Sequence, residues 1–419
     1  MNKSKPKIFI SCGELSGESH ASRVAIEIFK LCPGAQIRAF GSEILEELGV
    51  EVIKDYRDYS FSGISEVVTN ISTILSLKRE ISTEVIKWKP DVVLLVDYGG
   101  FNLQLAQAIK KNSPEIRIVE FIAPQIWASR PWRIKNIKRY VDKVLCTLPL
   151  EEKLYQEAGI NHKYVGNPVI DSLTKPMLKE DFLKQFDEIQ FRRGLSHSVT
   201  QSLSHSVTQP LIIGLFPGSR KSEIQAMLPL MIQASEELIK RNPGIDFRFI
   251  LAKAPTISKV LLERCGLKSP LAMALEGRSN HHIEILEAQD MLGSNHKLLS
   301  AADALWLCSG TVTLEAALYT TPYFLSYKSN LFNYILYLIF RTIKMAGLAN
   351  IISGRYIIRE FLQYNASVKN FVKETESWFE KDGSYSVYYH KIKTDLSELR
   401  SKLSGYNTAQ LVAEEILNK

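Results

Sequence analysis

The sequence predicts an α/β protein with two doubly wound, parallel β-sheets. Short apolar, β-rich runs alternate with amphipathic, helix-like runs through the first half of the chain, and the same alternation restarts at residue 211. A polar segment, LSHSVTQ, occurs at 195–201 and again at 203–209, between the two series. Nearly continuous apolar strands separated by helices are typical of a parallel sheet covered on both faces.

Each half contains recognisable elements in order. In the first half we expect strands at 7–11, 36–41, 50–56, 91–97, 116–124 and 143–149, with helices at 21–32, 43–48 and 101–111. In the second half we expect strands at 211–218, 247–253 and 304–310, a helix at 221–240 and a terminal helix at 406–418.

These elements suggest a domain division. We expect an N-terminal domain over 1–175, a junction over 176–210, a C-terminal domain over 211–390 and a helical segment over 391–419. The last segment packs back on the first domain or on a partner subunit. His197 and His205 in the repeat could be read as a metal pair, but a polar linker is favoured because serine-rich repeats cannot form a core.

Composition is that of an ordinary globular protein. The chain has 419 residues, 45% hydrophobic and 23% charged, with a net charge of +7. This mild, dispersed excess suits an anionic substrate or membrane surface and does not require nucleic acid. Five scattered cysteines without C-x-x-C spacing predict reduced thiols and a cytoplasmic location. The most apolar window, 331–340, is shorter than the ~20 residues that span a bilayer.

Glycine-bearing turns follow several predicted strands, where ligands bind in open α/β sheets. In the turn at 215–224, Gly218 and Ser219 can offer amides and a hydroxyl, and Arg220 can bind phosphate oxygens bidentately. In the turn at 309–315, a helix start faces a pyrophosphate and Glu315 lies one turn later, placed for ribose hydroxyls. Simple helix capping is the alternative for both turns.

Two turns of the first half carry acidic residues. The turn at 11–18 contains Glu14 and precedes a helix, and Asp97 ends the apolar strand 91–97. Asp97 is either a helix cap or a general base that removes a proton from an attacking hydroxyl. The chain contains no D-x-D triplet, so we expect no metal or other cofactor, with Arg220 and helix starts neutralising a diphosphate.

Taken together, the motifs resemble those of the lipid-A-disaccharide synthase family, inverting glycosyltransferases of the GT-B architecture. The matching stretches are CGELSGE (12–18), FSGISEVV (61–68), VDYGGFNL (96–103), APQIWASRPWRIKNI (123–137), YVGNPVID (164–171), LFPGSRKSEI (215–224), SGTVTLEAAL (309–318), GLANIISGR (347–355) and EFLQ (360–363).

The resemblance implies a reaction and a fold. Two Rossmann-like domains would flank a cleft in which 2,3-diacylglucosamine passes from UDP to the 6-hydroxyl of 2,3-diacylglucosamine 1-phosphate. The products would be a β-1,6 disaccharide and UDP. Alternatives are a UDP-sugar epimerase, a transferase with a different lipid acceptor, or a non-catalytic lipid- or nucleotide-binding relative. A monomer and a homodimer are both compatible with the sequence.

The resemblance also assigns residues. UDP-sugar binding falls on Gly218, Ser219, Arg220, Ser309, Gly310, Thr311, Glu315, Asn350, Arg355, Glu360 and Gln363. The acceptor side falls on Glu14, Ser16, Gly17 and Asn102, and the catalytic candidates are Asp97, Arg220 and Glu14.

Three positions depart from the family pattern. Gly100 occupies a position that is acidic in many members, Asn167 one that is usually histidine, and Glu18 one that is usually aspartate. Either Asp97 is the base, or another carboxylate such as Glu14 or Glu18 takes that role, or the activity is altered.

An apolar series could receive acyl chains. Its members fall mostly at helical spacing and precede Lys78 and Arg79: Phe61, Ile64, Val67, Val68, Ile71, Ile74, Leu75 and Leu77. Spacing alone favours a core-facing helix, whereas the resemblance favours a membrane-facing one. We therefore expect peripheral binding to anionic lipid at the inner face of the cytoplasmic membrane. Trp127, Arg130, Trp132 and Arg133 form an aromatic–basic cluster suited to stacking or to interdomain packing.

Overall fold

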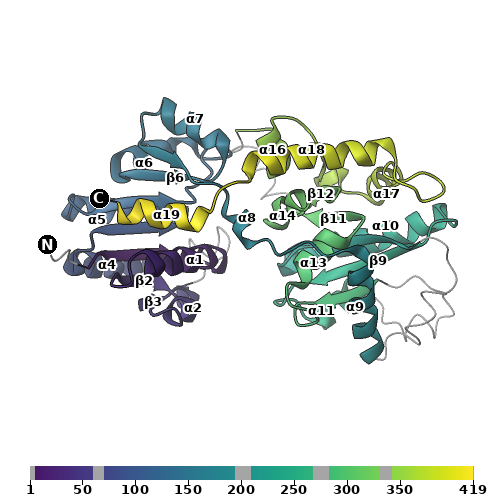
Figure 1. The fold of residues 1–419 in the computed structure, drawn as a ribbon, viewed down its shortest axis with the longest axis horizontal. Coiled ribbons are helices and arrows are strands. Elements are labelled where there is room, and N and C mark those ends of the chain that lie inside the picture. The colour runs from purple at the N-terminus through teal and green to yellow at the C-terminus, as the bar shows by residue number, and fades with distance from the viewer. Residues whose placement is uncertain (1–4, 60–69, 194–208, 268–282, 330–341, 419) are drawn as a thin grey trace. The chain divides into compact units, whose positions relative to one another are not determined.

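The computed structural model describes residues 5–59, 70–193, 209–267, 283–329 and 342–418 (Figure 1). The chain divides into two compact units. The first comprises Met1–Asp171, Phe340–Ile343 and Leu403–Lys419, and the second comprises Ser172–Ile339 and Lys344–Lys402.

The first unit is built on a seven-stranded parallel sheet in the order β3-β2-β1-β4-β5-β6-β7. Its central strands are buried along their length because helices cover both faces. The strands are β1 (Lys7–Cys12), β2 (Gln36–Gly41), β3 (Glu51–Asp55), β4 (Val92–Val96), β5 (Arg117–Phe121), β6 (Lys143–Cys146) and β7 (His162–Tyr164).

Helices on the two faces of this sheet enclose two apolar cores. They are α1 (Leu15–Leu31), α2 (Glu43–Glu46), α4 (Ile71–Trp88), α5 (Gly99–Asn112), α6 (Ile134–Tyr140), α7 (Pro149–Glu157), α8 (Pro168–Ser172) and α19 (Thr408–Leu417), with 3-10 turns η1 (Tyr56–Tyr59) and η2 (Pro131–Arg133). The C-terminal helix α19, yellow in Figure 1, packs against α1. Glu415 of α19 forms ion pairs of 2.5 Å with Lys143 and Lys163.

The second unit is built on a six-stranded parallel sheet in the order β10-β9-β8-β11-β12-β13. The strands are β8 (Leu211–Phe216), β9 (Phe247–Lys253), β10 (Glu284–Glu287), β11 (Ala304–Cys308), β12 (Tyr323–Tyr327) and β13 (Arg359–Leu362). Aromatic side chains fill its core, with Phe324 packed against Trp306, Phe371 and Trp378.

Its helices again alternate with the strands. They are α9 (Lys179–Arg192), α10 (Lys221–Arg241), α11 (Lys259–Arg264), α13 (Ser294–Ala301), α14 (Val312–Leu318), α16 (Leu348–Ser353), α17 (Val368–Glu376) and α18 (Val387–Leu403), with the 3-10 turn η3 (Gln363–Asn365).

The structure divides the chain differently from the sequence in two places. Much of the expected junction is helix α9, which belongs to the second unit because Phe182 and Phe186 bury its apolar face and Asp187 pairs with Arg248. Most of α18 also belongs to the second unit, so the segment that joins the first unit begins at Leu403 rather than 391. The repeat at 195–209 lies outside the described residues except for its last residue, Gln209.

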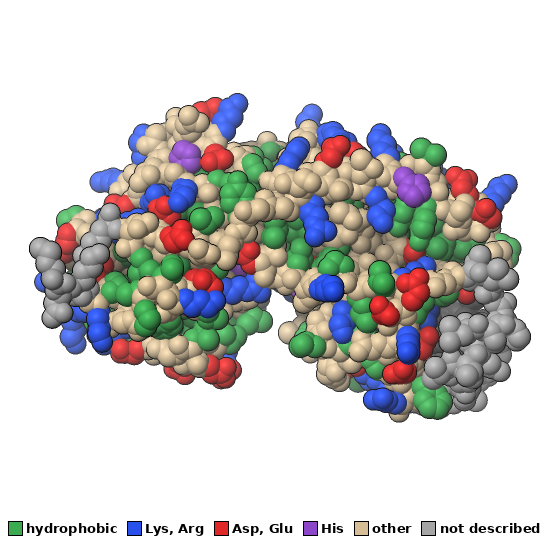
Figure 2. Space-filling model, in the orientation of Figure 1, with side chains coloured by type: hydrophobic (Ala, Val, Ile, Leu, Met, Phe, Trp, Pro, Cys, Tyr) green, Lys and Arg blue, Asp and Glu red, His purple; other side chains and the backbone are tan. Residues whose placement is uncertain are grey.

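Two features are relevant to membrane contact: the distribution of surface charge and the length and apolar character of the helices. Lys and Arg side chains are interspersed with Asp and Glu over the face shown in Figure 2. Among the helices that the structure describes, none has the length and apolar character needed to cross a bilayer. The apolar window at 331–340 is not part of the described chain.

Candidate active site

Each sheet has one point where the direction of strand progression reverses. In the first sheet β1 and β4 are neighbours, and the chain proceeds outward from them in opposite directions; β8 and β11 occupy the same position in the second sheet. At such a switch point the loops leaving the carboxyl ends of the strands diverge and open a crevice in which ligands bind. The glycine-bearing turns predicted from the sequence follow these four strands.

The turn after β8 is stabilised from within. Gly218 has a φ of +116°, and a Cβ there would lie 2.5 Å from the Glu223 carboxylate, so glycine is required. The amides of Ser219 and Arg220 donate to Glu223 Oε2 at 3.0 and 3.2 Å. We expected the Ser219 amide to face a ligand, but Glu223 occupies it by capping α10. The Arg220 side chain remains 73% exposed.

The turn after β11 is open. The Ser309 amide donates to Ser326 O at 3.1 Å and ties the turn to β12. No described residue accepts a hydrogen bond from the amides of Gly310, Thr311 or Val312 at the start of α14. Unpaired amides at a helix start favour an anion. The turn after β11 therefore differs from the turn after β8 in having backbone amides that no described residue occupies.

Glu315 lies one turn into α14. Burial raises the pKa of its carboxyl, and the described residues provide it with no hydrogen-bond partner. A partly buried acceptor of this kind gains by bonding to ligand hydroxyls. The contact of Glu315 with a ribose stays a prediction.

Charged residues at the β8 turn affect the pKa values of side chains at the ends of β11 and β12. Burial raises the pKa of Cys308 to about 12; Glu223 adds to this rise and Arg220 opposes it. The same two charges act on Tyr327, whose pKa is raised chiefly by burial. The turns after β8 and β11 thus belong to one region of the second unit. The sequence interpretation did not include Tyr327, since a tyrosine ending an apolar strand carries no distinctive signal.

Asn350 and Glu360 come together but serve the local fold. Asn350 accepts from the amides of Ile357 and Ile358 at 2.8 and 3.0 Å and donates to Glu360 Oε1 at 2.8 Å. Glu360 also accepts from the amides of Ala346 and Gly347 at 2.9 and 2.8 Å. These side chains shape the loop before α16.

The other two predicted donor-site residues have separate partners. Arg355 binds Asp395 at 3.0 and 2.8 Å and Glu398 at 3.5 Å, so its guanidinium is committed to α18. Gln363 has a φ of +54°, and its side-chain amide lies 2.9 Å from the Ser329 hydroxyl, linking the segments after β13 and β12. Of this pair, Gln363 lies at the carboxyl edge of the sheet.

In the first unit, glycines allow the turns after β1 and β4 to pack closely. A Cβ on Gly13 would lie 2.2 Å from the Tyr98 ring, and one on Gly17 would lie 3.5 Å from Asp97 Cβ. Gly17 is buried, whereas Glu14 and Ser16 are exposed. Glu14 and Ser16 therefore have the accessibility that the predicted acceptor side requires.

Asp97 has two properties of a functional side chain. Its φ is +39°, uncommon for a residue other than glycine, and its amide donates to Phe121 O at 3.3 Å. Burial, and secondarily the charge of Glu14, raises the pKa of its carboxyl to about 7. A carboxyl that titrates near neutrality is suited to general-base catalysis.

Other candidates in the first unit are already hydrogen-bonded. Glu18 accepts from the Ser42 amide and hydroxyl, both at 2.6 Å, and from Tyr56 Oη at 3.0 Å, which leaves it unsuited as a base. Asn102, expected on the acceptor side, is instead fully buried and bonded to Ser11 Oγ at 2.8 Å. Asn167 accepts from the Val169 amide at 3.1 Å at the start of α8.

Glu120 on β5 was missed by the sequence interpretation. Its side chain is fully buried, and neither carboxylate oxygen has a hydrogen-bond partner among the described residues. Burial and the charge of Asp97 raise its pKa to about 8, while Arg133 opposes the rise. The available signal was one acidic residue inside the apolar run IRIVEFIAP at 116–124.

Only part of the predicted membrane-facing series lies among the residues that the structure describes. Ile71 and Leu75 on α4 are 57% and 46% exposed, whereas Ile74 packs against the core and Leu77 is buried. Phe61, Ile64, Val67 and Val68 lie outside the described residues.

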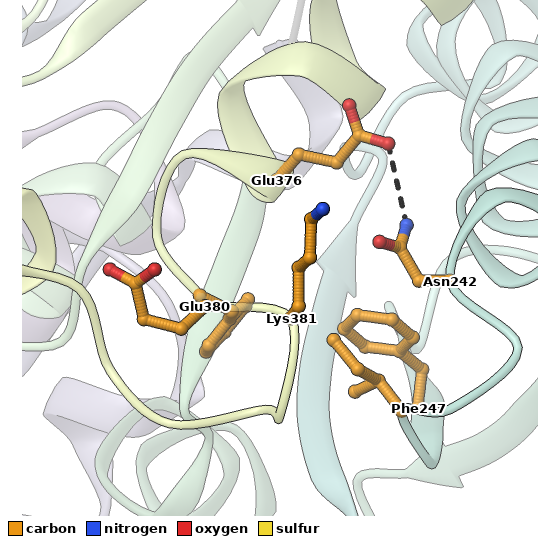
Figure 3. A pocket seen from close by; sticks show the side chains of 7 residues that line it. Asn242, Phe247, Glu376, Glu380 and Lys381 are labelled. Atoms are coloured by element: carbon orange, nitrogen blue, oxygen red, sulfur yellow. Dashed lines mark hydrogen bonds between the residues drawn. The ribbon is translucent and has the colours of Figure 1, made fainter.

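A cavity of about 280 Å³ lies at the opposite edge of the second sheet (Figure 3). It adjoins Phe247 at the amino end of β9, and Asn242 Nδ2 donates to Glu376 Oε1 at 3.4 Å on its wall. Because ligands of open α/β sheets bind at the carboxyl edge, this cavity is not part of the candidate site.

The two doubly wound units, with glycine-bearing turns at their switch points, define a protein of the GT-B class. Among solved structures, the chain is similar to MurG of Acinetobacter baumannii, with a TM-score of 0.58, 12% identity and coverage of 99% of this chain and 100% of that one. It is also similar to UDP-GlcNAc 2-epimerase of Neisseria meningitidis bound to UDP-GlcNAc, with a TM-score of 0.56, 14% identity and coverage of 99% and 100%. At these identities the likeness shows the fold.

Sequence relatives are more specific. A family model described as Lipid-A-disaccharide synthetase matches residues 8–416. The lipid-A-disaccharide synthase of Anaeromyxobacter sp. (strain K) is 33% identical over 411 residues, covering 98% of this chain and 97% of the relative. That of Myxococcus xanthus (strain DK1622) is 30% identical over 414 residues, with coverage of 98% and 97%. The chain belongs to the lipid-A-disaccharide synthetase family of glycosyltransferases, which confirms the predicted resemblance.

Proposed function

We propose that the enzyme transfers 2,3-diacylglucosamine from UDP to the 6-hydroxyl of 2,3-diacylglucosamine 1-phosphate, forming the β-1,6 disaccharide and UDP. Family membership supports this reaction. The structural observation that carries it is the open turn after β11, where the amides of Gly310, Thr311 and Val312 have no partner among the described residues. Such a turn suits the diphosphate of a UDP-sugar donor.

The donor end of the reaction needs stabilisation of a leaving group. As the bond between the anomeric carbon and the UDP oxygen breaks, negative charge grows on the diphosphate. Amides at the start of α14 and the exposed Arg220 guanidinium supply positive charge in fixed positions. Glu315 accepts hydrogen bonds from the ribose hydroxyls.

The acceptor end needs a base. Asp97 takes the proton of the 6-hydroxyl while the oxygen attacks the anomeric carbon from the face opposite UDP, which inverts that carbon. A pKa of about 7 leaves a large fraction of Asp97 ionised at neutral pH and still basic enough to accept a proton. Glu14 and Ser16, exposed on the adjoining turn, face the acceptor.

Neutralisation by backbone and Arg220 makes a divalent metal unnecessary in this proposal. We expect full activity after exhaustive chelation with EDTA. The measurement is UDP release before and after chelation, with added Mg²⁺ as the control. Loss of activity that Mg²⁺ restores would contradict this part of the proposal.

Acylated substrates also need access from a lipid phase. Ile71 and Leu75 expose apolar surface on α4, and Arg79 is exposed near them. We propose that this end of α4 contacts the anionic inner face of the cytoplasmic membrane, as a peripheral rather than spanning element.

The direct test uses purified full-length protein, UDP-2,3-diacylglucosamine and 2,3-diacylglucosamine 1-phosphate. UDP release should depend on both substrates, and mass spectrometry should detect the disaccharide. A parallel reaction with UDP-GlcNAc alone tests for epimerisation. Epimerisation without disaccharide formation, or UDP binding without turnover, would overturn the proposal.

A further inference from the structure

Glu120 is a buried acid that the fold does not satisfy. Its side chain has 0% exposure, and neither Oε1 nor Oε2 has a hydrogen-bond partner among the described residues. An ionised, unpaired carboxylate in such a place is strongly destabilising, so the group stays neutral to higher pH. Buried polar groups without partners are rare in folded proteins and call for an explanation.

The sheet places Glu120 beside Asp97. Glu120 pairs in register with Leu95 on β4, and the next residue of β5, Phe121, accepts a hydrogen bond from the Asp97 amide at 3.3 Å. The Asp97 charge contributes to the raised pKa of Glu120. The Asp97 carboxylate likewise has no hydrogen bond within the described part of the chain. Two neighbouring carboxyls thus each lack a partner.

Two further groups interact with Glu120. Arg133 on η2 attracts its negative charge, and Glu120 in turn opposes the lowering of the Arg133 pKa that burial causes. A Cβ on Gly100 would lie 3.8 Å from Arg133 Nη2, so position 100 brings no carboxylate to this guanidinium. The buried Tyr155 on α7 has a pKa raised by burial and, to a smaller extent, by Glu120.

Three acids therefore form a series from surface to interior. Glu14 is exposed, Asp97 is partly buried, and Glu120 is fully buried. Burial, and secondarily the charge of Glu14, raises the pKa of Asp97 to about 7; burial, and secondarily the charge of Asp97, raises that of Glu120 to about 8. Because Glu120 is fully buried and Asp97 is partly exposed, Glu120 is the carboxyl of the two that keeps its proton. Neutral Glu120 then has one O–H donor to offer.

We propose that Glu120 is a positioning residue: its protonated carboxyl donates a hydrogen bond through one water to Asp97 and orients the Asp97 carboxylate toward the acceptor hydroxyl. This inference rests on the proposed function.

In the proposed transfer step, bonds change at the acceptor oxygen, the anomeric carbon and the UDP oxygen. The acceptor O–H bond breaks, its electron pair forms the bond to the anomeric carbon, and the proton ends on Asp97. The bond to UDP breaks and its electron pair leaves with UDP. Glu120 keeps its own proton throughout.

The first test compares two substitutions at one position. Glu120→Gln retains a hydrogen-bond donor and cannot ionise, whereas Glu120→Met fills a similar volume without a donor. We expect the glutamine variant to keep kcat within about threefold at pH 7. The methionine variant should lose kcat by about tenfold, the equivalent of ~1.4 kcal/mol, with KM values changed less than about twofold. Wild-type kcat in Glu120→Met would overturn the proposal.

The pH profile is the second readout. Wild-type kcat should rise as Asp97 ionises near pH 7 and fall again as Glu120 ionises near pH 8 and ceases to donate. Glu120→Gln should retain the rise and lose the fall. Glu151→Gln is the matched control, since Glu151 is buried but already bonded to Trp127 and to the amides of Thr147 and Leu148. An identical fall at high pH in wild type and Glu120→Gln would contradict the inference.

A third readout needs no substrate. Because the folded-state pKa of Glu120 is raised from 4.5 to about 8, its contribution to stability is present below pH 4.5 and is lost as pH rises toward 8. The Tm of Glu120→Gln should therefore gain on that of wild type between pH 5 and pH 9. The stability difference between Asp97→Asn and the double variant Asp97→Asn/Glu120→Gln isolates Glu120 from the titration of Asp97 itself. That difference should be smaller at pH 8 than the difference between wild type and Glu120→Gln, because the Asp97 charge that helps raise the Glu120 pKa is gone.

The outcomes separate the two proposals. If wild-type protein fails to transfer the sugar yet Asp97→Asn changes the Glu120-dependent stability curve, the carboxyl pair stands and the proposed function fails. If transfer occurs but Asp97→Asn leaves that curve unchanged, the function stands and the role of Glu120 fails.

Discussion

The two switch points share a topology and differ in chemistry. In the second unit, the unsatisfied groups are backbone amides at the start of α14, with the exposed Arg220 in the preceding turn of the same sheet. In the first unit, the corresponding groups are the unsatisfied, buried carboxyl of Glu120 and the partly buried carboxyl of Asp97, both with raised pKa values. Donors suit an anionic leaving group, and acids near neutrality suit proton removal. The two edges therefore occupy the same place in the topology and differ in the chemical groups that they carry there.

Asp97→Asn should have the largest effect, because it removes the base while keeping the shape of the side chain. We expect kcat to fall about 10³-fold, within the range for general-base catalysis, with little change in donor KM. Steady-state UDP release measures both constants. Glu157→Gln, at an exposed position on α7, is the control. If Asp97→Asn retained more than a tenth of the wild-type kcat, Asp97 would not be the general base.

Arg220→Ala should come next, because it removes positive charge from the leaving-group side. A loss of kcat of about 10²-fold is expected, typical of deleting one group that stabilises transition-state charge. The rise of kcat with pH near 7 should remain, since Asp97 is untouched. Lys221→Ala, one residue later at the start of α10, should stay close to wild type. Equal losses in both variants would show a non-specific charge effect.

Glu315→Gln should have a smaller effect, confined to donor binding. The amide oxygen still accepts a hydrogen bond but lacks the strength of a carboxylate, so we expect donor KM to rise about tenfold with kcat nearly unchanged. Isothermal titration with UDP checks the same loss without turnover. Unchanged UDP affinity would place the ribose elsewhere.

The smallest effect should come from the surface of α4. Replacing both Ile71 and Leu75 with serine removes exposed apolar area, so we expect sedimentation with anionic vesicles to fall about threefold or more. Turnover of detergent-dispersed substrates should be retained. Ile26→Ser on α1, also an exposed apolar position, is the control. Equal sedimentation of wild type, the double serine variant and Ile26→Ser would show that this surface of α4 does not contribute to membrane binding.

Much of the site follows from sequence patterns, and some of it does not. The turns after β1, β4, β8 and β11 were located correctly because glycines follow apolar strands in each case. The capping of the β8 turn by Glu223 was missed, although Glu223 lies only three residues beyond Arg220. A carboxylate at that spacing either caps its helix or faces solvent, and the sequence does not distinguish the two.

Contacts between residues far apart in the sequence could not be predicted from sequence patterns. Arg355 pairs with Asp395, 40 residues later, and Asn102 bonds to Ser11, 91 residues earlier. The family motifs identified both residues as notable but could not assign their partners. Helix α9 shows the same limit, since its place in the second unit depends on the pairing of Asp187 with Arg248, 61 residues away.

The sequence by itself determined the α/β class, the family and the turns that carry polar groups, because strand and helix periodicities and short motifs are local properties. Tertiary structure alone decided that Glu18 is fully hydrogen-bonded, that the amides of Gly310, Thr311 and Val312 stay free within the described chain, and that Glu120 lies buried on the strand next to the one that Asp97 follows. Burial and hydrogen-bond satisfaction depend on groups brought together from distant parts of the chain, and these two quantities set the charge and reactivity of a side chain.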